Sequence, residues 1–111
     1  MSQITTHILD TTNGMPAAGV TIILYAQESE WLEIAKGVTN VDGRIGDLLP
    51  EGELLPNGTY KLKFLTRDYF DQHSINSFYP FIEIVFSINT TAHYHIPLLL
   101  NPFGYTTYRG S

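Results

Sequence analysis

The feature that most constrains the fold of this chain is the alternation of apolar and polar residues in short segments rich in β-branched and aromatic side chains. In Thr59–Leu65, for example, Tyr60, Leu62 and Phe64 share one face and the two intervening lysines point to the other. A period of two is that of a β-strand with one buried face. Because such segments recur between closely spaced turn signals, the sequence predicts an all-β sandwich of two sheets.

Turn residues divide the chain into eight expected strands and one helix. The strands are expected at Ile4–Asp10, Val20–Gln27, Trp31–Thr39, a short piece after the turn at Val41–Arg44, Thr59–Leu65, Phe81–Ile88, Ala92–Leu100 and Phe103–Tyr108. Arg67–Ser77 lacks alternation and carries several polar residues, which predicts a short helix after the fifth strand. Pro50–Gly58 holds two Pro and two Gly, so we expect a loop there.

Length and composition exclude several classes of function. The 111 residues suit one domain, 1–111, and no stretch is apolar enough to cross a membrane. The N-terminal residues do not resemble a signal peptide, so a cytoplasmic location is expected. Six Lys and Arg, spread along a chain of net charge −5, form no basic patch for nucleic acid. Without cysteine, neither disulfides nor thiolate chemistry is available.

The two faces of Ala92–Leu100 differ in kind. Its even positions are apolar and predict sandwich core: Tyr94, Ile96 and Leu98. Its odd positions combine imidazoles with apolar residues: His93, His95, Pro97 and Leu99. Such a mixed face is unusual for a surface exposed to solvent, and it indicates a surface that another subunit covers. In the first expected strand, His7 shares its face with Thr5 and Leu9.

Each histidine has a structural interpretation beside a functional one. A single His on a strand is usually a hydrogen-bonded or surface residue; we adopt that interpretation for His73 and favour it for His93. His93 and His95 lie two residues apart on one face and could chelate a metal, yet no third ligand is evident. We therefore expect no metal and no cofactor. A histidine acting as general base is the remaining possibility.

Two segments of the chain resemble a known family. The run Thr6–Ala17, with its Leu-Asp pair and its Gly-x-Pro-Ala turn, is similar to the opening of transthyretin and its relatives. The run His93–Ser111 resembles the 5-hydroxyisourate hydrolases of the transthyretin-like family, whose chains end in Tyr-Arg-Gly-Ser, as Tyr108–Ser111 reads here. The resemblance covers essentially the whole chain. It implies a transthyretin-like (prealbumin-like) two-sheet sandwich of about eight strands with one short helix.

The resemblance also implies a set of site residues. Those implied as catalytic are His7, Arg44, His95 and Ser111. Those implied to bind substrate are His7, Arg44, Tyr108, Arg109 and Gly110. Arg44 stands in an Asp-Gly-Arg turn that matches the family's Gly-Arg motif. The vertebrate hormone carrier of the same family lacks these His and Arg residues and the Tyr-Arg-Gly-Ser ending.

The implied reaction is hydrolysis of 5-hydroxyisourate, the product of urate oxidation, to 2-oxo-4-hydroxy-4-carboxy-5-ureidoimidazoline. With no cysteine and no serine in a triad motif, attack by a water activated by His7 and His95 is the simpler scheme, with Arg44 stabilising the developing charge. Which histidine is the base is left open.

The resemblance further implies a homotetramer, a dimer of dimers. Its channel would be lined by His7, Leu9, His95, Pro97, Leu99, Thr106 and Tyr108. Two other functions compete with hydrolysis: a non-catalytic carrier of small molecules, and a structural β-sandwich module.

Overall fold

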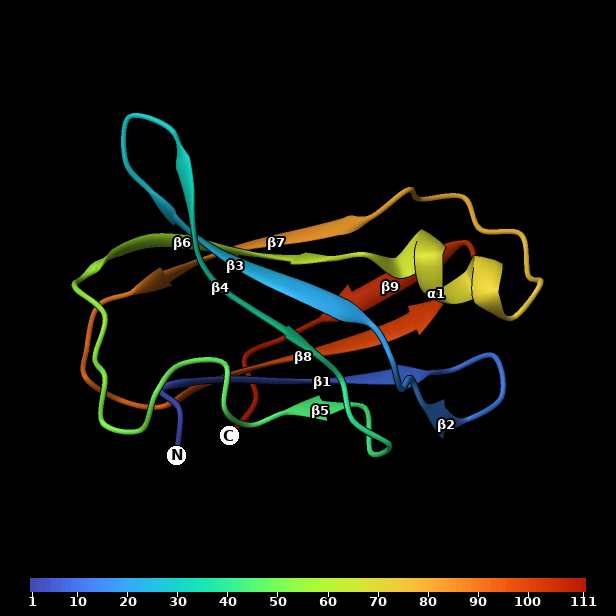
Figure 1. Ribbon diagram of the computed structural model, residues 1–111, viewed down its shortest axis with the longest axis horizontal. Coiled ribbons are helices and arrows are strands. Elements are labelled where there is room, and N and C mark those ends of the chain that lie inside the picture. Colours follow the sequence, from blue (N-terminus) through green and yellow to red (C-terminus); the bar gives the residue numbers. More distant parts are fainter.

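The computed structural model describes the whole chain, Met1 to Ser111, as two facing sheets with one helix at the end of the sandwich (Figure 1). The five-stranded sheet contains β2 (Met15–Pro16), β1 (Ile4–Asp10), β8 (Tyr94–Asn101) and β9 (Gly104–Thr107) in that order, with β5 (Arg44–Ile45) also paired to β1. The four-stranded sheet has the order β4 (Trp31–Val38), β3 (Thr21–Gln27), β6 (Gly58–Phe64) and β7 (Ile82–Ile88). The predicted all-β sandwich with one short helix is confirmed.

The strand β2 was not predicted. The sequence indicated only a turn between Asn13 and Pro16, whereas Met15 and Pro16 turn back and pair with the end of β1. Gly14, with a φ of 70°, makes the reversal that this short hairpin requires. A two-residue strand leaves no room for alternation, so its pairing carries no periodic signal. The other strands begin and end within two residues of their expected bounds.

The predicted helix Arg67–Ser77 is wrong in its C-terminal half. The helix α1 spans Thr66–Gln72 and is capped by His73. Ser74 adopts a left-handed conformation with φ of 56°, and Ile75 donates a backbone hydrogen bond back to Phe70, which closes the helix. The His73 ring bonds the Tyr69 carbonyl through Nδ1 at 2.9 Å, which confirms its structural interpretation. No helix in this fold has the length and apolar character needed to span a membrane.

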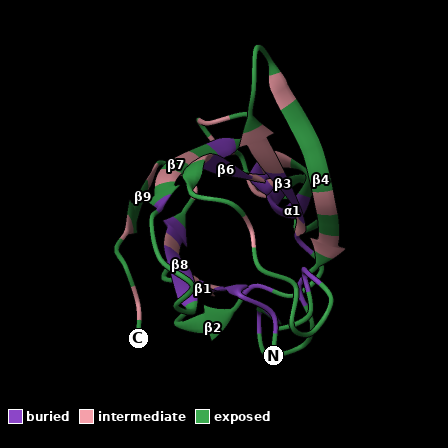
Figure 2. Cartoon of the chain, turned by 90° about the vertical axis from the view of Figure 1, so that its left-hand side faces the viewer, coloured by how far each residue is buried: buried purple, intermediate pink, exposed green.

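The core lies between the inner faces of the two sheets, and the alternation predicted it correctly (Figure 2). The residues expected to face inward are buried to 6% exposure or less: Val20, Ile22, Leu24, Tyr60, Leu62, Phe64, Tyr94, Ile96 and Leu98. Lys61 is also buried, although it lies on the outer face of β6. Its amine is covered by the Trp31 ring, 4.4 Å away, and pairs with Glu83 at 3.0 Å.

The pairing of β1 with β8 is parallel, and it positions the residues that follow. The register sets Thr5 beside His95 and His7 beside Pro97. One strand comes from the first residues of the chain and the other from the last quarter, so no local sequence signal reveals this partnership. The pairing brings the His7 face of β1 and the His95 face of β8 onto one outer surface of the five-stranded sheet.

Candidate active site

Two imidazoles meet across β1 and β8. His7 lies in the middle of β1 and His95 is the second residue of β8. The His7 Nδ1 and His95 Nε2 atoms are 2.7 Å apart, and the rings stack with their centroids 4.9 Å apart. The other nitrogen of His95, Nδ1, is hydrogen bonded to Thr5 Oγ1 at 2.7 Å. Within this pair, only Nε2 of His7 has no hydrogen-bond partner in the chain.

Arg44 is held beside His7 by backbone pairing. In the antiparallel pair of β5 and β1, Arg44 stands directly opposite His7, so the two side chains are neighbours on one face. Gly43 permits this close approach. It has a φ of 71°, and a Cβ there would lie 2.5 Å from the Ile8 carbonyl oxygen. The Asp-Gly-Arg turn therefore fixes where the guanidinium enters the site.

Both histidines are biased toward the neutral form. Burial lowers the pKa of His7 below its ordinary 6.5, and the charge of Arg44 lowers it further. Burial also lowers the pKa of His95, followed by the effects of His7, Arg44 and His93. Since His95 is only 9% exposed, burial is consistent with its position in the fold. A neutral imidazole near pH 7 can accept a proton, which a general base must do.

Gly110 and Ser111 join the histidine pair. The Gly110 amide donates a hydrogen bond to the His95 carbonyl at 2.8 Å. A Cβ at Gly110 would lie 2.7 Å from Cδ2 of the His95 ring, which is closer than real side chains approach. Ser111 then lies in the same hollow as Arg44 and His95. Of the residues implied as catalytic, the structure thus brings all four to one region.

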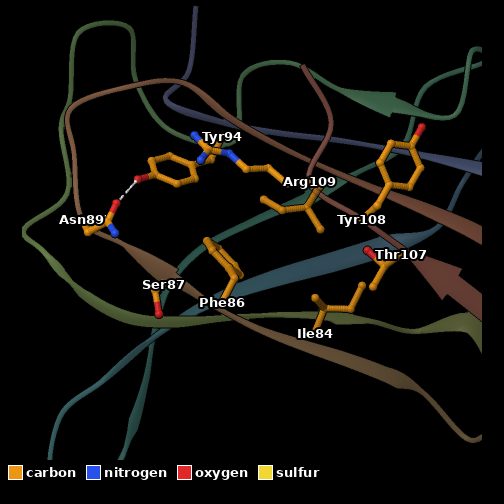
Figure 3. A pocket seen from close by; sticks show the side chains of 9 residues that line it. Ile84, Phe86, Ser87, Asn89, Tyr94, Thr107, Tyr108 and Arg109 are labelled. Carbon is orange, nitrogen blue, oxygen red and sulfur yellow. Dashed lines mark hydrogen bonds between the residues drawn. The ribbon is translucent and has the colours of Figure 1, made fainter.

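Tyr108 and Arg109 line a different hollow, at the open edge between the two sheets, where β7 faces the C-terminal segment (Figure 3). The Arg109 guanidinium carbon lies 4.3 Å from the centre of the Tyr94 ring, a cation–π contact. No hydrogen bond or ring contact joins either residue to the histidine pair. The expected strand Phe103–Tyr108 included Tyr108, but β9 ends at Thr107, so strand alternation does not determine where the Tyr108 side chain points.

The metal alternative has no geometric support among these side chains. No group of three or more His, Cys, Asp or Glu residues is arranged to hold an ion. His93 and His95 do not converge on an open point; both bond the hydroxyl of Thr5, each at 2.7 Å. Their shared partner is a hydrogen-bonding group of the protein itself.

Two residues at the site were not identified from the sequence. Thr5 was noted only for sharing a face with His7, and for His93 a structural interpretation was favoured. The spacing of Thr5 and His7 was a usable signal, because residues two apart on a strand share a face, and one can lie opposite and the other diagonal to the same residue of an adjacent strand. Recognising that neighbour as His95 required the parallel pairing of β1 with β8.

Comparison with known proteins places the chain in a family. The family model described as HIUase/Transthyretin matches residues 4–110. The chain belongs to this family. Within it, a 5-hydroxyisourate hydrolase from Mus musculus is 46% identical over 114 residues, which covers 99% of this chain and 96% of the relative.

Solved structures similar to this chain include a 5-hydroxyisourate hydrolase and a transthyretin bound to thyroxine. The 5-hydroxyisourate hydrolase from Klebsiella pneumoniae superposes with a TM-score of 0.87 at 38% identity, covering 97% of this chain and 98% of the other. Sea bream transthyretin, solved in complex with thyroxine, superposes with a TM-score of 0.91 at 33% identity, covering 98% of this chain and 95% of the other. Overall shape is therefore shared by both branches, and the side chains at the site must distinguish them.

Proposed function

We propose that this protein is a 5-hydroxyisourate hydrolase that opens a ring amide of its substrate with a histidine-activated water. The observation that carries the proposal is the hydrogen-bonded pair of His7 and His95 with Arg44 opposite His7. Relatives named as 5-hydroxyisourate hydrolases support the same reaction. The product of this reaction would be 2-oxo-4-hydroxy-4-carboxy-5-ureidoimidazoline, and the reaction would be a step of urate degradation.

The free Nε2 of His7 supplies the base in this scheme. It takes a proton from water as the water oxygen bonds to the ring carbonyl carbon. Arg44 stabilises the negative charge that collects on the carbonyl oxygen, because backbone pairing already places this residue opposite His7. When the carbon–nitrogen bond breaks, the departing nitrogen receives the proton from His7, and the ring-opened product, which carries the new carboxyl group, leaves the site. The pair returns to its starting state, so no cofactor is consumed.

The carrier alternative rests on fold alone. Sea bream transthyretin matches the fold slightly better than the Klebsiella hydrolase does, with TM-scores of 0.91 and 0.87. A channel that only holds a ligand has no need of two neutral, mutually bonded imidazoles beside a guanidinium. Burial, and after it the charge of Arg44, lowers the pKa of both histidines, which costs stability at acidic pH and is useful for proton transfer. The site chemistry therefore favours hydrolysis.

A homotetramer, built as a dimer of dimers, is part of the proposal. The outer surface around the histidines carries an apolar strip in which Leu9 stands beside Leu99 in the β1–β8 register, next to Pro97. A second subunit covering this strip would exclude water from the site. Sedimentation velocity should give the mass of four chains, and a monomer at catalytic concentration would contradict this arrangement.

The reaction is tested directly by generating 5-hydroxyisourate with urate oxidase and following its ultraviolet absorbance with and without the protein. We expect decay far faster than the spontaneous rate. His7→Ala and His95→Ala should each lower kcat on the order of 10²–10⁴-fold, the range for a lost acid or base. A wild-type protein that leaves the spontaneous rate unchanged would favour the carrier.

A further inference from the structure

The histidine pair is one end of a longer chain of hydrogen bonds. Thr5 Oγ1 lies 2.7 Å from Nδ1 of His95 and 2.7 Å from Nε2 of His93. His95 Nε2 in turn lies 2.7 Å from Nδ1 of His7. Four side chains, from β1 and from β8 with the residue before it, thus form one line: His93, Thr5, His95, His7. His93 is exposed at one end, and the free Nε2 of His7 stands at the other.

A single hydroxyl between two imidazoles couples their protonation states. A threonine hydroxyl has one proton, so it donates to one ring nitrogen and accepts from the other. If it donates to His93, it accepts from Nδ1–H of His95, which leaves His95 Nε2 bare to accept from Nδ1–H of His7. Nε2 of His7 is then bare as well and can act as a base. If the Thr5 hydroxyl instead donates to Nδ1 of His95, each hydrogen bond of the chain reverses its direction. His95 then carries its proton on Nε2, and so does His7.

We propose that Thr5 is a positioning residue for the hydrolase reaction, because its hydroxyl donates to His93 and thereby holds His95 with its proton on Nδ1. This inference rests on the proposed function for its kinetic consequence, but not for the tautomer itself. The Thr5 hydroxyl is bonded to the two imidazoles, His93 and His95. It acts through His95, and His93 acts through Thr5 as the acceptor that sets the direction of the chain.

The charged surroundings favour the same direction. Arg44, on β5, stands opposite His7 and offers only hydrogen-bond donors, so a bare nitrogen on His7 suits that face better than a second N–H. His93 is the one imidazole of the three that is exposed, and water can satisfy whichever of its nitrogens is left over. Thr5 itself is 8% exposed, so its hydroxyl has little access to water and depends on the two imidazoles.

The tautomer can be read without any assay of activity. In wild-type protein labelled with ¹⁵N-histidine, long-range proton–nitrogen spectra at about pH 8 distinguish Nδ1–H from Nε2–H in neutral imidazoles. The His95 signals are assigned from their loss in His95→Gln. We expect His95 to carry its proton on Nδ1 in the wild type, and to lose this preference in Thr5→Val, which keeps the shape of the side chain but lacks the hydroxyl.

Kinetics then test the consequence. Thr5→Val should lower kcat roughly tenfold or more, the rate equivalent of a lost buried hydrogen bond, with KM within about twofold because the substrate contacts remain. Thr5→Ser, which restores a hydroxyl, should recover most of the activity. His93→Gln, whose amide oxygen can take the place of Nε2 as acceptor, should stay active, whereas His93→Phe should resemble Thr5→Val.

Thr39→Val is the matched control. Thr39 is also buried, and its hydroxyl also makes two hydrogen bonds, from the Val20 amide and to the Ala17 carbonyl, away from the histidines. It should lose stability as Thr5→Val does and keep its kcat. A wild-type His95 protonated on Nε2, or a Thr5→Val enzyme with unchanged kcat, overturns the proposal. If the wild type does not hydrolyse 5-hydroxyisourate at all, the proposed function fails, and the spectra still decide the tautomer.

Discussion

The contact between Gly110 and the His95 ring gives a sharp test of the site. In Gly110→Ala the added Cβ would lie 2.7 Å from His95 Cδ2, whereas ordinary contacts begin near 3.4 Å. The two groups must therefore separate by about 0.7 Å, the difference between these distances. The ring cannot yield freely, because its nitrogens are bonded to Thr5 and His7 at 2.7 Å each. Relief of the clash has to stretch at least one of these bonds or lift the backbone at Gly110.

The magnitude follows from the precision that catalysis demands. A misplacement near 1 Å at a reacting group costs about 100-fold in rate. A displacement of slightly less, acting through the His7–His95 bond, should lower kcat by roughly 10- to 100-fold. Gly110 does not have a positive φ, so alanine adds no backbone strain there, and the loss of stability should be that of one overpacked contact, about 1–3 kcal/mol.

Initial rates of 5-hydroxyisourate decay measure the effect, and urea unfolding confirms that the variant is folded. Gly58→Ala is the control, because a Cβ there meets its nearest atom at 3.7 Å, an ordinary contact far from the histidines. It should retain full activity. A Gly110→Ala enzyme with the kcat of the wild type would refute the idea that this contact fixes the His95 ring.

Other perturbations probe charge, core and tail. Because burial and Arg44 lower the pKa of His7 and His95, kcat/KM should fall only below pH 6.5, and Arg44→Gln should move this acid limb upward in a pH–rate profile. In the unfolded chain His7 and His95 take up protons near their ordinary pKa of 6.5, whereas in the folded chain they do so only at lower pH. The free energy of unfolding, measured by urea titration, should therefore decrease as the pH falls from 6.5 through the folded pKa values. Tyr69→Phe should destabilise by about 1–3 kcal/mol at unchanged kcat, since the Tyr69 hydroxyl, whose pKa is raised to about 12, donates to the buried Asp10 carboxylate. Deleting Arg109–Ser111 should reduce kcat more than stability, and a truncated enzyme of normal rate would contradict a role for this segment.

Alternation was enough to predict the sandwich and its core. It assigned the inward faces of β3, β6 and β8 correctly because burial on one side of a sheet imposes a period of two. It failed where that constraint is absent. The two-residue β2 is too short for a period, and the end of α1 is set by the left-handed Ser74, a backbone conformation that serine adopts only rarely.

The candidate site residues came from the resemblance more than from the pattern. Alternation indicated an unusual mixed face at His93 and His95, but it did not reveal that Thr5 joins them, because the parallel pairing of β1 with β8 links segments far apart in the chain. Long-range pairing depends on which edges meet in the folded state, and a single sequence does not encode that locally. The expectation that Arg109 belongs with the histidines came from the same resemblance, and in the single chain its guanidinium packs on Tyr94 instead.

The separate positions of Arg109 and Gly110 suggest what the C-terminal segment does mechanically. Tyr94 and His95 are consecutive on β8 and point to opposite faces of the sheet, Tyr94 to the core and His95 to the outer surface. Arg109 covers the ring of the first, and Gly110 packs on the ring of the second. The segment therefore contacts the start of β8 on both faces of the sheet, and between these contacts the Gly110 amide donates a hydrogen bond to the His95 carbonyl. A shift of the Arg109 guanidinium off Tyr94 would therefore also move Gly110, the next residue along the chain, which limits where the His95 ring can lie.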